Sequence, residues 1–134
     1  SALKVVIAIL TIAILGGVVN DREFNIETLL FQISMPGIDE EIMYRGVLLG
    51  LMCSALRSGG VAWRNPAIII NGIWFGLVHS LAFQNGEVVF SVASFIVTGL
   101  VGYALAYIAL RSRSILIPML THNLCNFCNN WALP

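Results

Sequence analysis

The most chemically suggestive stretch of the sequence is Asp39 to Arg45, which carries four charges within seven residues of an otherwise strongly apolar chain. The segment that follows, Gly46 to Leu56, has no charged residue, yet at about 1.5 Å per residue it covers only about half of a ~30 Å hydrocarbon core. A membrane-spanning helix must therefore begin near Pro36, which places the charges at membrane depth. Ionisable groups at that depth are costly and usually functional, for example as a general base.

One of the two adjacent glutamates has a purely structural explanation. Glu41 and Arg45 are four residues apart, in the order that favours an ion pair on one face of a helix. Glu40 has Tyr44 at the same spacing, and its side chain lies about 100° round the helix from that of Glu41. Glu40 therefore needs a partner from another part of the chain, which makes it the first candidate for catalysis.

Later apolar stretches contain three more polar side chains suited to acid–base chemistry or hydrogen bonding, namely His79, His122 and Asn126. Each taken alone is more simply explained as a hydrogen-bonded core residue. Together with Glu40 they indicate a shared site, because polar groups persist in hydrocarbon mainly where they have a function. Helical spacing predicts that the ring of Phe75 lies beneath the His79 imidazole and that His122 and Asn126 share a face.

The composition of the whole chain indicates an integral membrane protein. Of its 134 residues, 58% are hydrophobic and 10% are charged, and the mean hydropathy is +0.89, which excludes an ordinary soluble fold. The net charge is zero and no basic patch is interleaved with aromatics, so nucleic-acid binding is not expected. The three cysteines are too few for a disulfide framework and are interpreted as small core residues, Cys53, Cys125 and Cys128.

The hydrophobic pattern predicts an all-α, multi-pass transmembrane helix bundle of about five spans plus a short amphipathic helix. One predicted span, residues 88–110, carries small residues at positions 99, 102 and 106 that suit close helix packing. Residues 84–87 are expected to form a tight loop. The predicted spans are Leu3 to Val19, Pro36 to Leu56, Pro66 to Phe83, Val88 to Leu110 and Ile115 to about Leu133, with the amphipathic helix at Ile26 to Met35.

The chain is expected to form a single membrane-embedded domain over residues 1–134, with a catalytic core at about 36–130. It begins with Ser1 rather than Met, so we expect it to be processed, tagged or truncated, which leaves room for helices upstream. Basic residues gather on one side of the predicted bundle and only Arg22 falls on the other. By the positive-inside rule, the N-terminus and both arginine-bearing loops are expected on the cytoplasmic side.

The polar residues follow one another along the chain in a pattern that resembles the CAAX prenyl endopeptidase and bacteriocin-processing (CPBP) family. This family is also called the Abi family of glutamate intramembrane proteases. The resemblance covers about residues 36–130, which is most of the chain. It implies an intramembrane endopeptidase that hydrolyses a peptide bond without a metal or other cofactor. Three motifs carry it: Glu40-Glu41-x-x-x-Arg45, Phe75-x-x-x-His79 and His122-x-x-x-Asn126.

The resemblance also implies a role for each motif residue. Glu40 would be the general base that activates a water, and His79 would orient that water or pass its proton. His122 and Asn126 would donate hydrogen bonds to the tetrahedral oxyanion. The ion pair of the first motif would support the site structurally. The expected partners are a peptide or protein substrate, prenylated or not, and membrane lipid.

Two alternatives remain open at this stage. A zinc-dependent membrane protease could use Glu40, His79 and His122 as ligands with one open position for water, although no His pair at helical spacing fixes two ligands on one helix. A non-catalytic immunity or scaffold protein could instead use its buried charges only to fix helix register. The sequence does not identify the substrate in any of these cases.

Overall fold

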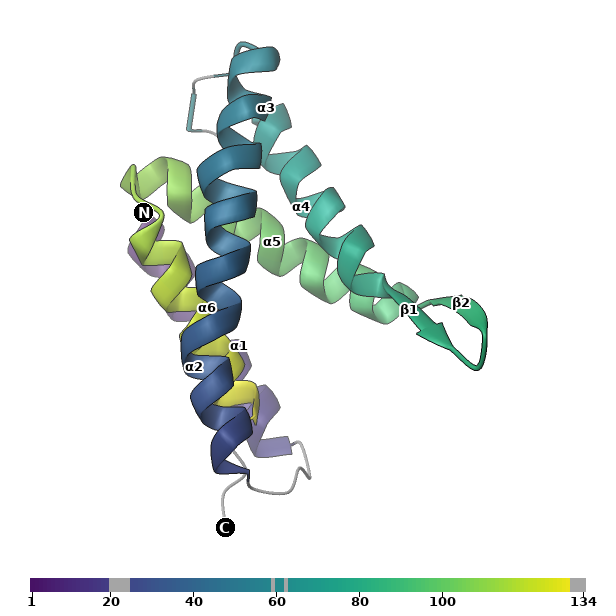
Figure 1. Cartoon of the computed structure of the whole chain (residues 1–134). Coiled ribbons are helices and arrows are strands. Elements are labelled where there is room, and N and C mark those ends of the chain that lie inside the picture. Colours follow the sequence, from purple (N-terminus) through teal and green to yellow (C-terminus); the bar gives the residue numbers. More distant parts are fainter. Residues whose placement is uncertain (20–24, 59, 62, 131–134) are drawn as a thin grey trace.

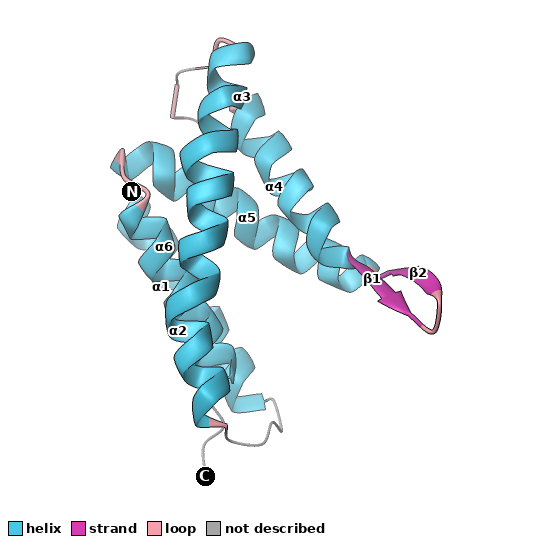
Figure 2. Cartoon of the chain, viewed as in Figure 1, coloured by secondary structure: helices cyan, strands magenta, loops and turns pink. Residues whose placement is uncertain are grey.

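The computed structural model describes residues 1–19, 25–58, 60–61 and 63–130, and these residues form helices, one small hairpin and short connecting turns (Figures 1 and 2). This confirms the predicted all-α class. The stretch between the first predicted span and the predicted amphipathic helix, residues 20–25, and the end of the last predicted helix, near Leu133, lie largely outside the described residues. Five helical segments are present in the described part: α1 (Ala2–Val19), a continuous helix formed by α2 (Ile26–Glu41), η1 (Ile42–Leu48) and α3 (Leu49–Ala55), then α4 (Pro66–Ser80), α5 (Val92–Ser112) and α6 (Leu116–Asn130).

The predicted boundary between an amphipathic helix and a second span at Pro36 is wrong. Pro36 lies inside α2, which begins after the N-cap Asn25 and continues without a break through η1 and α3. Proline normally interrupts a helix because it lacks an N–H group. Here Asn123 of α6 stabilises the backbone on both sides of the proline: its Nδ2 donates to the Ser34 carbonyl at 3.1 Å, and its Oδ1 accepts from the Gly37 N–H at 2.7 Å.

Strands β1 (Leu81–Gln84) and β2 (Glu87–Phe90) form an antiparallel hairpin between α4 and α5. The predicted helices that ended at Phe83 and began at Val88 are therefore too long at these ends. The two turn residues between the strands, Asn85 and Gly86, have φ angles of 53° and 87°. Two consecutive positive φ angles are typical of a tight hairpin turn, for which Asn-Gly is a preferred sequence.

One helix in the described part of the chain, α5, is long and apolar enough to cross a membrane, and α1 and α4 are shorter apolar helices. The structure thus supports the helical class without establishing five spans. Many large apolar side chains on these helices are nevertheless exposed on the outside, including Leu15, Trp74 and Leu100.

Helices α4 and α5 pack closely through glycines, as the small-residue face predicted. A Cβ atom added to Gly72 of α4 would lie 2.7 Å from Cβ of Tyr103, and one added to Gly102 of α5 would lie 2.7 Å from Cβ of Phe75. Both distances are too short for a side chain, so only glycine permits this approach. On the other side of the molecule, α6 packs against α1 and α2 (Figure 1). These contacts hold α2, α4 and α6 around a common cavity.

Candidate active site

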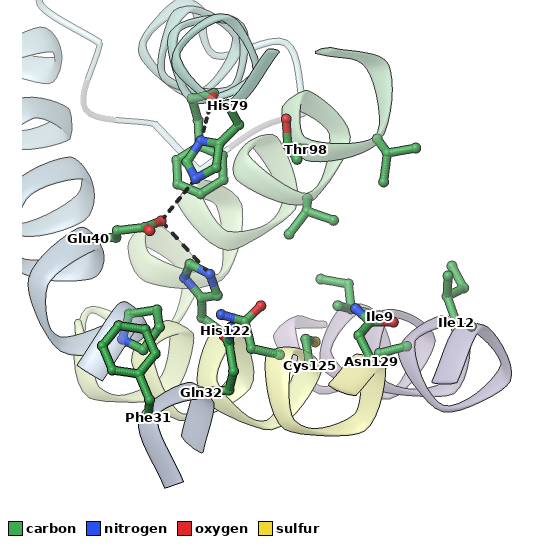
Figure 3. Close-up of a pocket in the computed structure, with 17 residues that line it drawn as sticks. Ile9, Ile12, Phe31, Gln32, Glu40, His79, Thr98, His122, Cys125 and Asn129 are labelled. Atoms are coloured by element: carbon green, nitrogen blue, oxygen red, sulfur yellow. Dashed lines mark hydrogen bonds and ion pairs between the residues drawn. The ribbon is translucent and has the colours of Figure 1, made fainter. Parts of the chain in front are cut away.

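Four side chains from three helices line a single cavity of about 610 Å³. Figure 3 shows Glu40 of α2 lying between His79 of α4 and His122 of α6. Oε2 of Glu40 is 3.4 Å from Nε2 of His79 and 3.9 Å from Nε2 of His122. Asn126, which follows His122 by about one helical turn, lines the same cavity. Residues far apart in the sequence therefore meet around one carboxylate.

The orientation of His79 is fixed by its own helix. Its Nδ1 lies 2.8 Å from the carbonyl oxygen of Phe75, and because a carbonyl only accepts, Nδ1 carries the hydrogen. The imidazole also stacks on the Phe75 ring, with centroids 4.2 Å apart and an interplanar angle of 29°. The predicted ring beneath His79 is confirmed, and it leaves Nε2 directed at Glu40.

The orientation of His122 is fixed from a different helix. Its Nδ1 lies 2.8 Å from Oε1 of Glu41, a carboxylate that is completely buried. The carboxylate acts as acceptor, so Nδ1 donates and Nε2 is left facing Glu40. The two imidazoles thus share one arrangement: each is held through Nδ1 and each presents Nε2 to the same oxygen of Glu40.

The ion pair between Glu41 and Arg45, expected from their spacing, is present and buried, with a Nη1 to Oε1 distance of 2.8 Å. Nη2 of Arg45 also donates to the Gly102 carbonyl of α5 at 3.0 Å, and the guanidinium carbon lies 4.5 Å from the Phe75 ring centroid. Arg45 belongs to the π-helical segment η1, a form that often occurs near functional sites. The pair lies behind the cavity wall, and it connects α2 to α5 and to His122.

Several cavity residues were not expected from the sequence. Gln32 and Asn129 contribute amides, Thr98 contributes a hydroxyl, and α1 contributes an apolar wall that includes Ile9 and Ile12. An apolar residue that faces a cavity looks the same in a sequence as one that faces lipid. Gln32 fell in the segment interpreted as an interfacial helix, where a polar residue needs no further explanation.

No group of three or more His, Cys, Asp and Glu side chains in the described ranges is arranged to hold a metal ion. The zinc hypothesis therefore rests on the sequence alone. Cys125 lines the cavity, and it is a free cysteine like Cys53 and Cys128.

A model of the Rce1-like family, described as type II CAAX prenyl endopeptidase Rce1-like, matches residues 22–128. The matched range contains all four candidate catalytic residues and the buried ion pair, whereas α1 precedes it. No curated protein and no solved structure matches the sequence.

Proposed function

The chain belongs to the type II CAAX prenyl endopeptidase Rce1-like family, an integral membrane family of proteases, and on that premise we propose that it is an intramembrane endopeptidase with Glu40 as its general base. One observation carries this proposal: two imidazole Nε2 atoms, each fixed through Nδ1, face one carboxylate oxygen inside a cavity. Fixed acid–base groups of this kind suit hydrolysis of a peptide bond by an activated water.

In the proposed reaction, Glu40 takes a proton from a water whose oxygen forms a bond to the carbon of the scissile carbonyl. The tetrahedral intermediate then breaks its C–N bond, and the leaving amine takes up that proton. His79 contacts Glu40 and shares the mouth of the cavity with it, since both side chains are about 30% exposed. We therefore assign His79 to orienting the water and passing the proton.

His122 and Asn126 are the proposed donors to the oxyanion. Since Nδ1–H of His122 is directed to Glu41, His122 donates to the oxyanion through Nε2 when that atom also carries a hydrogen. The Asn126 amide adds a neutral donor in the same cavity. Each oxyanion donor in such a site is typically worth about 3–4 kcal/mol of transition-state stabilisation.

We further propose a multi-pass placement in the membrane, with α5 and the flanking apolar helices as spans. The outward-facing apolar side chains on α1 and α4, such as Leu15 and Trp74, support it, because large exposed apolar surfaces are rare in soluble monomers. The apolar side of the cavity, formed by Ile9, Val97 and Val101 among others, suits an apolar group on the substrate. A prenylated peptide is therefore the preferred substrate class.

The test is mass-spectrometric detection of cleavage in a mixed set of prenylated and unprenylated peptides by the detergent-purified chain. We expect cleavage by the parent and by Glu27→Gln, which alters an exposed glutamate on the same helix, and no cleavage by folded Glu40→Gln. Normal turnover by Glu40→Gln would remove Glu40 from the mechanism.

A parallel reaction with a chelator separates the zinc alternative. Cleavage should persist in the chelator; its loss, together with stoichiometric metal in the purified protein, would favour a zinc enzyme. The scaffold alternative predicts instead that Glu40→Gln, His79→Ala and Asn126→Ala all retain the biological effect of the parent.

A further inference from the structure

Two amide side chains outside the proposed catalytic set face the cavity, Gln32 from α2 and Asn129 from α6. Within the described residues, neither side chain has a hydrogen-bond partner. In Figure 3, Asn129 lies beyond Cys125 from His122. Its Oδ1 is close to α1, since a Cβ atom added to Gly16 would lie 3.0 Å from it. Both side chains are partly exposed, so their amide groups are accessible to a group that enters the cavity.

Two other amides in the helices, those of Asn123 and Asn71, have partners on a neighbouring helix. Asn123 pairs both its polar atoms with α2, as described above. Asn71 donates to the Tyr44 carbonyl at 2.9 Å, which ties α4 to the π-helical segment. Amides with a structural role are thus bonded across helix interfaces, and Gln32 and Asn129 differ from them in facing the cavity.

The backbone carbonyl of Gln32 lacks its usual partner within the helix. Pro36 follows Gln32 by four residues in α2 and also lines the cavity. Because proline has no N–H, it cannot donate the intrahelical hydrogen bond that the Gln32 carbonyl would otherwise accept. Gln32 therefore has a side-chain amide and, in addition, a backbone carbonyl that Pro36 leaves without its usual helical donor.

The position of these amides along the helices suggests what they bind. Gln32, Pro36 and Glu40 recur at every fourth position of α2, so they lie on one face. Gln32 is about 12 Å from Glu40 along the helix axis, and Asn129 is about 10 Å from His122, at about 1.5 Å per residue. An extended peptide covers about the same distance in three residues, at roughly 3.3 Å each.

We propose that Gln32 and Asn129 hydrogen-bond the backbone of the substrate about three residues from the scissile bond, and so hold it extended along the cavity. This rests on the proposed protease function. An amide side chain offers one acceptor and two donors, which matches the N–H and C=O of a peptide group. A peptide entering an apolar cavity must find such partners for its own backbone.

The experiment is a backbone scan with a set of apolar peptides in which one peptide N–H at a time is N-methylated. Binding is measured by fluorescence anisotropy to Glu40→Gln protein, so that cleavage is not required, and kcat and KM are measured with the otherwise unmodified chain. We expect methylation at one position, about three residues from the cleaved bond, to raise the Kd of the peptide about tenfold. A change of this size is expected when one good hydrogen bond is lost.

The same scan is repeated with Gln32→Met and Asn129→Leu, which keep side-chain size but remove the amides. In these variants, N-methylation at that position should raise the Kd by about twofold or less. In the catalytically intact background these variants should raise KM and leave kcat close to the parent value. Gln84→Met, on the exposed hairpin outside the cavity, serves as the matched control and should keep the parent pattern. Circular dichroism establishes that each variant is folded.

The outcomes separate this inference from the proposed function. Equal sensitivity to methylation with and without the two amides would overturn the inference even if the chain cleaves peptides. Amide-dependent binding without any cleavage would overturn the protease proposal and leave Gln32 and Asn129 as peptide ligands. An absence of peptide binding to any variant would overturn both.

Discussion

Nδ1 of His122 lies 2.8 Å from Oε1 of Glu41, and the same oxygen accepts a hydrogen bond from Nη1 of Arg45, also at 2.8 Å. One buried carboxylate oxygen therefore serves a local ion pair within one helix and an imidazole from another. This contact gives Glu41 an effect on the candidate site that its sequence spacing did not reveal.

The Glu41→Gln variant tests this contact. We expect kcat to fall about 10- to 100-fold with little change in KM, because an uncharged amide is a weaker acceptor for the Nδ1–H of His122 and orients the imidazole less firmly. Steady-state kinetics on folded protein measures both constants, and Glu27→Gln on the exposed part of α2 is the control. A kcat within twofold of the parent would contradict the positioning role.

The Arg45→Ala variant should mainly lower stability. Removing the guanidinium leaves Glu41 as an uncompensated buried charge and the Gly102 carbonyl without its side-chain donor. Breaking a buried pair in this way typically costs about 3–5 kcal/mol in the free energy of unfolding. Thermal unfolding in detergent measures the change, and Arg111→Ala, at an exposed position, should stay within about 0.5 kcal/mol. An unchanged melting temperature for Arg45→Ala would reject the structural role.

A methyl group at Gly102 should separate α4 from α5. The added Cβ would lie 2.7 Å from Cβ of Phe75, so we expect Gly102→Ala to destabilise the fold by about 1–3 kcal/mol. It should also reduce activity, since Phe75 carries the ring and the carbonyl that orient His79. Unfolding measurements and peptide cleavage test the two effects.

Gly50→Ala is the matched control for that substitution. An added Cβ at Gly50 meets no atom within 4 Å, and alanine favours the helix, so this variant should be neutral or up to about 1 kcal/mol more stable. Equal stability of the two glycine variants would show that the α4–α5 contact is looser than the structure indicates.

Two asparagines on α6 should give opposite results when each is changed to alanine. Asn123→Ala removes both hydrogen bonds to α2 and should lower stability by about 1–3 kcal/mol. Asn126→Ala should leave the melting temperature near that of the parent but lower kcat by about 10²- to 10³-fold, as expected for an oxyanion donor. Activity retained in Asn126→Ala would exclude that role for its side chain.

Composition and local spacing were enough to indicate a helical membrane protein and to select the polar residues worth following. The Glu41–Arg45 pair, the Phe75 ring under His79 and the glycine face of α5 were all predicted from spacings of three or four residues, because an α-helix brings such residues onto one face. The resemblance to the CAAX protease family is likewise carried by short motifs, and the family match confirms it.

Only the tertiary structure decided how the helices that carry these residues pack against one another. Helix continuity through Pro36 depends on Asn123 of α6, and the contact of His122 with Glu41 depends on the packing of α6 against α2. The wall from α1 and the inward-facing amides Gln32 and Asn129 depend on which face of each helix is turned to its neighbours. Local periodicity assigns residues to a face, but what that face contacts is determined by packing between segments far apart in the chain, which sequence spacing does not encode.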